Sequence, residues 1–230
     1  MGIAILIPEL VIYETINNIL EYIKNDYNTK SNKKTSYLWH VFGEDEDDRP
    51  LKLGKMNLYE QAIDIFVNGG LDKKRKIEVT VGYNMQRVGL PTIHITMPSD
   101  NPINAGIGDN EGYTSPIVDG VKKETFRTVT ADSSVVYNLI ISSDNVNECL
   151  IIYNLLKAAG LGFKSQFELK GFMNTKIGGN DLQLADDLMP TNIFHRNFNI
   201  SFEYNYTSID PFPQKYGDNF KVDLFPEVNN

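Results

Sequence analysis

A stretch of strict alternation near the end of the chain constrains the fold most. Over ten residues, apolar Phe198, Ile200, Phe202, Tyr204 and Tyr206 alternate with polar Asn197, Asn199, Ser201, Glu203 and Asn205. A period of two over that length predicts a β-strand with one buried face and one wet face. The polar face holds no catalytic group in a recognisable setting, so we expect this strand to present a surface.

The length and composition are typical of a globular protein. The chain has 230 residues, enough for one large domain or two small ones with a substantial core. A hydrophobic fraction of 41% and an aromatic fraction of 11% argue against disorder. The net charge of −8 argues against a general affinity for nucleic-acid phosphates, although an acidic surface would let DNA slide past without adhering.

The single cysteine, Cys149, excludes an internal disulfide, which fits a reducing cytoplasm. It lies beside Leu150 and Ile151 in an apolar helical run, so we interpret it as a buried structural thiol and not as a nucleophile. Residues 2–7 are apolar but too short for a signal peptide, and no basic segment precedes them. We therefore expect no targeting segment and no membrane association.

The first quarter of the chain predicts a helix and a short strand. Pro8 suits the first turn of a helix, and apolar residues at three- and four-residue steps predict an amphipathic helix over about residues 9–27. Residues 28–37 are polar and basic and are expected to form a loop. Residues 37–42 are predicted as a short strand, which the acidic run at 44–48 ends.

A second helix and two strands follow. Asn57, with Glu60 three residues later, resembles a capping box and predicts a helix start. The Gly69-Gly70 pair predicts its end. Alternating apolar residues then predict strands at 77–83 and 93–97.

Residues 98–123 are predicted as a long loop because they are rich in proline and glycine. The residues concerned are Pro98, Pro102, Gly106, Gly108, Gly112, Pro116 and Gly120. Loops of this length inside a compact domain are uncommon and usually functional. Strands are expected at 125–130 and 135–142. A helix is then expected to begin at Asn145 and to end at Gly160.

The last part of the chain completes the predicted fold. Phe167 and Leu169 suggest a strand, and 178–191 is predicted as a loop before the final strand. Because the strands mostly cluster without intervening helices, the predicted class is α+β, with helices packed on a mixed or mainly antiparallel sheet. We expect one domain over residues 1–208 and an extended C-terminal tail over 209–230, which orders against a partner.

The three histidines show no metal-binding pattern. His40, His94 and His195 are not spaced from one another, or from cysteine, as zinc ligands would be. His94 alternates with two isoleucines and is interpreted as a solvent-facing strand residue. His195 and Arg196 precede the long strand, where they form either a contact pair or ordinary surface. We expect no metal and no cofactor.

The acidic run is Glu44, Asp45, Glu46, Asp47 and Asp48. It lacks the sixth-position glycine and the twelfth-position glutamate of a calcium-binding EF-hand loop, and Arg49 and Pro50 follow it, so a solvated charged loop is favoured. Gly106 and Gly108 lack the third glycine of a dinucleotide-binding loop. The patterns of a phosphate-binding loop and of a serine nucleophile elbow are also absent from the sequence. We do not expect an enzyme.

The last third of the chain resembles structural proteins of the bacteriophage head–tail neck, and it is most similar to the tail-terminator and tail-completion group. The resemblance rests on residues 136–148, the apolar helix after them, and residues 180–183, 189–196 and 202–204. The first two thirds agree only in the order of elements: a leading helix, a sheet, a helix across it, and closing strands.

The resemblance implies a closed homo-oligomeric ring, commonly a hexamer, that caps the tail tube and joins it to other neck proteins. Such a ring would be assembled in the host cytoplasm, would remain in the virion, and would let DNA pass through its lumen without specific binding. Ring closure requires interfaces in which one patch meets a different patch on the neighbour. We interpret residues 44–48 as a candidate lumen patch, because carboxylates repel DNA phosphates.

Two other interpretations remain open at this stage. The 12 tyrosines and the abundant asparagine also suit a baseplate or receptor-binding module of a phage tail. A small hydrolase with an unrecognised site is the other. Closed rings of about six or twelve subunits would favour the neck protein, trimers the receptor-binding module, and a monomer with a deep acidic cleft the hydrolase.

Overall fold

The computed structural model describes residues 7–45, 48–69, 76–82, 89–103, 110–114, 117–118, 121–122, 126–181 and 193–209. The contacts divide the chain into two compact units. The larger unit contains the described residues between 7 and 103 and between 133 and 204. The smaller unit contains the described residues between 110 and 132 and between 205 and 209. The single domain predicted for residues 1–208 remains a prediction, and the predicted tail lies outside the described residues from 210 onward.

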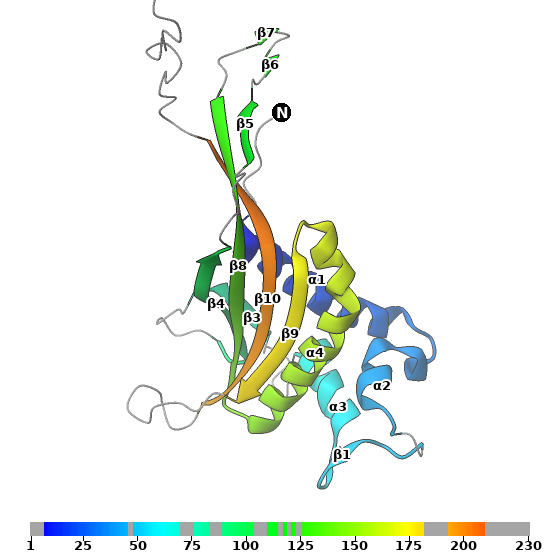
Figure 1. Cartoon of the computed structure of the whole chain (residues 1–230). Helices are drawn as coiled ribbons and strands as arrows, with labels where there is room; N and C mark the ends of the chain where they lie inside the picture. The colour runs from blue at the N-terminus through cyan, green and yellow to red at the C-terminus, as the bar shows by residue number, and fades with distance from the viewer. Residues whose placement is uncertain are drawn as a thin grey trace, which may run out of the picture. The chain divides into compact units, whose positions relative to one another are not determined.

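The larger unit combines helices with strands of a mixed sheet (Figure 1). Its helices are α1 (Pro8–Thr29), the short η1 (Lys33–Thr35), α2 (Tyr37–Phe42), α3 (Leu58–Ile63), the π-helical turn η2 (Asp64–Asn68) and α4 (Val146–Leu169). Its strands are β1 (Lys52–Leu53), β2 (Met56–Asn57), β3 (Glu78–Val81), β4 (Thr92–Pro102), β8 (Phe126–Ser143), β9 (Met173–Asp181) and β10 (Phe194–Ile209). Strands β8 and β10 also contribute residues to the smaller unit.

The main sheet has the strand order β3-β4-β8-β10-β9. β3 pairs with β4 in parallel, whereas the β4–β8 and β9–β10 pairs are antiparallel. Side-chain contacts from Ser142 to His195 and from Tyr137 to Phe202 indicate that β10 also runs antiparallel to β8. Strands β1 and β2 form a separate small antiparallel pair. The predicted α+β class with a mixed sheet is therefore confirmed.

Helices α1 and α4 cover the same face of this sheet (Figure 1). The Tyr137 hydroxyl on β8 donates a hydrogen bond to Glu9 on α1 at 2.8 Å. The Phe198 ring on β10 meets the Tyr153 ring of α4 edge-on, with centroids 6.3 Å apart. Since Tyr137 also stacks on Phe202 of β10, the two helices share one continuous core. The sheet's other face carries the polar side chains of β10.

The predicted alternation of the last strand is confirmed on its apolar side as far as Tyr204. Phe198, Ile200 and Phe202 are each 2% exposed, and Tyr204 is 7% exposed. Tyr206, which was predicted to continue the buried face, is 41% exposed and ends it. The buried face is thus confined to the part of β10 that lies in the larger unit.

Two local predictions in the first half are confirmed. The Asn57 side chain accepts hydrogen bonds from the amides of Tyr59 and Glu60, at 3.0 and 3.4 Å, and so caps α3. Gly69 adopts the left-handed conformation, with φ of 75°, and ends η2. Such a conformation favours glycine because a side chain there would be strained.

Residues 37–42 form helix α2, not the predicted strand. Leu38 and Phe42 are both buried. Positions four apart share a face in a strand as well as in a helix, so this apolar pattern cannot distinguish the two. The Ser36 hydroxyl decides the outcome: it accepts a hydrogen bond from the Trp39 amide at 3.3 Å, which caps the helix start.

Helix α4 continues past Gly160, where the sequence predicted its end, and so replaces the strand predicted at Phe167 and Leu169. A Cβ atom on Gly160 would lie 3.1 Å from Ile177 Cδ1 and 3.2 Å from Phe198 Cζ. This glycine therefore lets the helix pack closely on the sheet. The buried Phe167, at 2% exposed, anchors the last helical turns in the core.

Strand β9 includes Gly178 and Gly179, which were predicted to begin a loop over 178–191. Gly179 pairs with Phe198 of β10. A Cβ atom on Gly179 would clash with the Tyr153 hydroxyl and would lie 2.8 Å from the Asn197 carbonyl oxygen. Packing against α4 thus requires glycine here. Residues 182–191 of the predicted loop lie outside the described residues.

The prediction of a loop over residues 98–123 is wrong, because parts of four strands lie within that range. β4 extends to Pro102, with an irregularity between Thr96 and Ser99 that accommodates Pro98. In the smaller unit, β5 (Asn110–Thr114) pairs antiparallel with the first residues of β8, and β6 (Ile117–Val118) pairs with β7 (Val121–Lys122). Pairing with the long β8 supplies the order that proline and glycine content alone did not predict.

Candidate functional site

Three members of the acidic run, Glu44, Asp45 and Asp48, are described, and they lie between α2 and β1. The Lys34 ammonium contacts Glu44 Oε1 at 3.2 Å. Asp45 accepts hydrogen bonds from the Arg49 backbone amide at 2.9 Å and from Arg49 Nε at 3.1 Å. Asp48 has a positive φ of 57°, which the turn requires. Glu44 and Asp45 therefore each have a cationic partner.

The remaining members of the run, Glu46 and Asp47, lie outside the described residues. The interpretation of 44–48 as a lumen patch remains a prediction. Paired carboxylates such as Glu44 and Asp45 repel phosphate less than free ones, because the neighbouring cation offsets their charge. A strong negative electrostatic field from this run would have to come from its other members, Glu46, Asp47 and Asp48.

His195 and Arg196 do not contact each other as a pair. They are neighbours on β10, so their side chains point to opposite faces of the sheet. His195 Nδ1 forms a hydrogen bond with Ser142 Oγ at 2.7 Å on the face away from the helices. The Arg196 guanidinium lies 5.4 Å from the centre of the Tyr153 ring of α4 on the other face. The strand thus separates the two candidates.

The face of the sheet opposite the helices carries a polar row, which we call the polar sheet face. It comprises Thr80, His94, Ser142, His195, Asn197 and Asn199. Thr80 Oγ1 and His94 Nδ1 are 2.8 Å apart, and Asn197 Nδ2 donates to Asn180 Oδ1 at 3.0 Å. These hydrogen bonds link β3 to β4 and β9 to β10, so the row cross-links adjacent strands by side chains.

The polar sheet face is not freely wet, which corrects two predictions. His94, predicted to face solvent, is only 6% exposed, and Asn197, predicted on the wet face, is 4% exposed. Burial lowers the pKa of His94, partly opposed by the charge of Glu78. Burial also lowers the pKa of His195, and His94 lowers it further. Both imidazoles are therefore neutral at pH 7, since charging them here is unfavourable.

Several buried polar atoms of the sheet lack a hydrogen-bond partner in the part of the chain that the structure describes. On the polar sheet face they are His195 Nε2, Asn197 Oδ1 and Asn199 Oδ1, and on the helix-covered face Thr175 Oγ1 also has none. A buried polar atom without a partner costs free energy because it has lost its water. The face can therefore still accept hydrogen bonds at the two amide oxygens.

Cys149 is buried, as predicted, at 1% exposed. Its thiol lies 3.2 Å from the Phe194 carbonyl oxygen. Burial raises its pKa to about 12, with a further contribution from the charge of Glu148. The carboxylate of Glu148 itself accepts a hydrogen bond from the Ser143 hydroxyl. A thiol with so high a pKa stays protonated at neutral pH and is a poor nucleophile.

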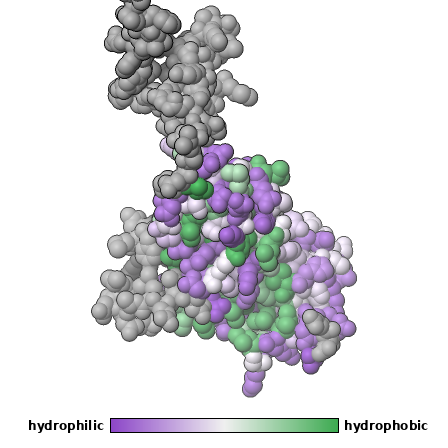
Figure 2. All heavy atoms as spheres, in the orientation of Figure 1, coloured by the Kyte–Doolittle hydropathy of each residue, from purple (hydrophilic) through white to green (hydrophobic). Residues whose placement is uncertain are grey.

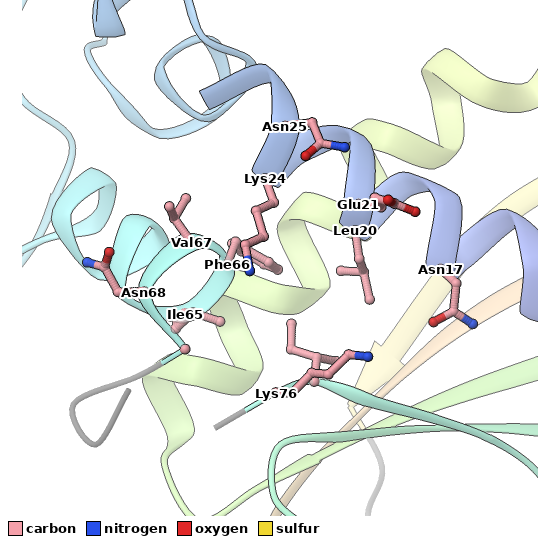
Figure 3. A pocket seen from close by; sticks show the side chains of 12 residues that line it. Asn17, Leu20, Glu21, Lys24, Asn25, Ile65, Phe66, Val67, Asn68 and Lys76 are labelled. Carbon is pink, nitrogen blue, oxygen red and sulfur yellow. The ribbon is translucent and has the colours of Figure 1, made fainter. Parts of the chain in front are cut away.

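A pocket of about 630 Å³ lies between α1, η2 and the start of β3 (Figure 3). Leu20, Phe66 and Ile77 supply its apolar surface, and Lys24 and Lys76 supply its cations. Sequence reasoning missed this site, because its walls come from segments far apart in the chain and no local spacing links them. The one local indication is the π-helical turn η2, a conformation often found at functional sites.

Apolar side chains also reach the surface. In Figure 2, green apolar surface gathers where α3 and α4 lie in Figure 1 and again near the end of α4. At that end Leu161 is 63% exposed and Leu169 is 87% exposed, and Met173 at the start of β9 is 43% exposed. Several exposed apolar residues in one region are typical of an interaction surface.

The described ranges contain no group of three or more His, Cys, Asp or Glu side chains arranged to hold a metal ion. Within the same ranges, no helix has the length and apolar character that crossing a membrane requires. Comparison with protein-family models gives no match. No curated protein matches the chain either.

Proposed function

We propose that the protein is a structural virion protein of a tailed bacteriophage, a tail-terminator or neck ring component. In this proposal, copies of the chain form a closed ring, commonly a hexamer, that joins the tail tube to the head connector. The ring contacts the tail tube and other neck proteins, and DNA passes through its lumen. It is assembled in the host cytoplasm and remains in the virion.

The observation that carries this proposal is the order and arrangement of the elements. A leading helix, a mixed sheet, a helix across that sheet and closing strands follow one another, as the tail-terminator resemblance implies. Helices α1 and α4 cover one face of the sheet, and β3 and β9 are the end strands of the order β3-β4-β8-β10-β9 (Figure 1). The net charge of −8 supports passage of DNA without adhesion.

The exposed apolar residues at the end of α4 supply one side of the ring contact in this proposal. Leu169, at 87% exposed, gains most from being covered, because burying a leucine side chain contributes roughly 1.5–3 kcal/mol. A ring needs a different patch on the neighbour to receive it. The contact is therefore directional, from the α4 end of one copy to another surface of the next.

Light scattering after size-exclusion chromatography, together with negative-stain imaging, tests this proposal on the full chain. We expect closed rings of one size. Leu169→Lys is expected to reduce ring formation without lowering the melting temperature, because the side chain is exposed. Leu53→Lys, at a residue that is 48% exposed on the β1–β2 pair, is the matched control and leaves assembly unchanged. Trimers or a monomer in the presence of tail-tube protein would refute the ring.

A further inference from the structure

The pocket between α1 and η2 combines an apolar floor with a cationic rim. Phe66 and Ile77 are each 8% exposed and form the floor with Leu20. Lys24 reaches from α1 toward Phe66, and Lys76 lies on the other side, just before β3 (Figure 3). Both lysines are exposed, and neither forms an ion pair within the described part of the chain.

The pocket therefore has a local positive charge in an acidic protein. Two lysines oppose a single wall carboxylate, Glu21, whereas the whole chain carries a net charge of −8. Its volume of about 630 Å³ lies within the roughly 300–1,000 Å³ of pockets that bind small ligands. Such a site has room for a few large side chains, so it suits a short peptide motif that is apolar and acidic.

We propose that this pocket receives the C-terminal segment of a neighbouring copy of the same chain, residues 218–230. This segment places Leu224 and Phe225 between the acids Asp223 and Glu227. Its apolar side chains match the floor of the pocket, and its acids match Lys24 and Lys76 in charge. The inference rests on the proposed ring, because another copy has to supply the segment.

The length of the chain after β10 fits this role. β10 ends at Ile209, so 21 residues follow it, and the peptide motif lies near their end. An extended chain of this length spans roughly 70 Å, at about 3.3 Å per residue. That reach exceeds the diameter of a compact subunit of this size, about 45 Å from its expected radius of gyration.

Reversing the charges on each side tests the inference in the full chain. The pocket variant is Lys24→Glu with Lys76→Glu, and the tail variant is Asp223→Lys with Glu227→Lys. We expect each variant alone to lose rings, because like charges then meet. An equimolar mixture of the two variants should recover rings, since each tail then finds a pocket of opposite charge on its neighbour. Docking of each tail into its own pocket would give no recovery and would overturn the proposal.

A labelled synthetic peptide of residues 218–230 gives a readout that does not depend on rings. Fluorescence anisotropy should show binding to the full-length tail variant. Adding the pocket substitutions to that variant should weaken binding roughly tenfold, because two exposed ion pairs are lost and two repulsions appear. Lys157→Glu with Lys164→Glu, at exposed sites on α4, carries the same change in charge and should leave binding unchanged.

The outcomes separate this inference from the ring proposal. Rings that form equally well in the pocket variant, together with a peptide that binds all variants alike, would overturn the pocket inference and leave the ring intact. A peptide that binds through Lys24 and Lys76 to a chain that stays monomeric would refute the ring and support the pocket as a peptide site. Melting temperatures equal to that of the unchanged chain confirm that the variants are folded.

Discussion

Replacing Phe202 with alanine tests how the two covering helices are joined through one core. The ring is 2% exposed at the centre of an aromatic stack. It lies parallel to Phe172 with ring centroids 3.9 Å apart, and it stacks on Tyr137 at 5.7 Å. Tyr137 also donates a hydrogen bond to Glu9 of α1. Phe202 therefore connects Phe172, just after α4, to the start of α1.

The expected cost follows from this burial. Removing a buried phenylalanine ring typically destabilises a protein by about 3–5 kcal/mol, because apolar burial is lost and a cavity remains. Loss of the stacked pairs is contained in that figure, at roughly 0.5–1.5 kcal/mol for each pair. For a chain of this size, each kcal/mol shifts the melting temperature by about 2–4 °C, so the apparent transition should fall by roughly 10 °C.

Tyr206→Ala is the matched control, because the residue lies on the same strand but is 41% exposed. Its effect should stay within about 0.5 kcal/mol, as for most surface substitutions. Urea unfolding followed by near-ultraviolet circular dichroism measures both variants. If Phe202→Ala unfolded at the same urea concentration as Tyr206→Ala, the stack would not be part of the core as described.

Two further predictions concern β9 and the polar sheet face. Gly179→Ala should lower the unfolding free energy by about 1–3 kcal/mol, because its Cβ would meet the Asn197 carbonyl oxygen at 2.8 Å and the paired backbone resists movement; a urea midpoint unchanged from the parent would contradict this. Burial holds the pKa values of His94 and His195 below their usual 6.5. As the pH is lowered through 6.5, the unfolded chain therefore binds more protons than the folded one, and the unfolding free energy decreases. The double variant His94→Asn with His195→Asn should lose less stability between pH 7 and pH 5, as urea midpoints at both pH values would show, and an equal loss in both chains would refute the assignment.

The candidate site was predictable only in part. Cys149 was identified as a buried thiol from its apolar neighbours, because burial follows from a local helical pattern. The acidic run was recognised from its sequence, but its pairing with Lys34 depends on how η1 lies beside the turn. His195 and Arg196 were singled out together, yet they face opposite sides of β10. The sequence could not show which other strands and helices meet each face.

Local patterns in the sequence determined the elements whose signals are self-contained. The alternation in β10, the apolar stripe of α1 and the Asn57 cap each depend on neighbours within a few residues, so each could be predicted from spacing. The α+β class followed because strands that cluster without intervening helices rarely form any other arrangement.

Only the tertiary structure decided the elements whose signals were ambiguous or distant. Gly160 and Gly179 read locally as breaks, and an isolated glycine within a helix costs about 1 kcal/mol relative to alanine. Close packing between α4 and the sheet offsets that cost: a Cβ atom on Gly160 would crowd Ile177, and one on Gly179 would clash with Tyr153. The pocket beside Lys24 and Lys76 likewise exists only after distant segments meet, since contacts between them have no local signature in the chain.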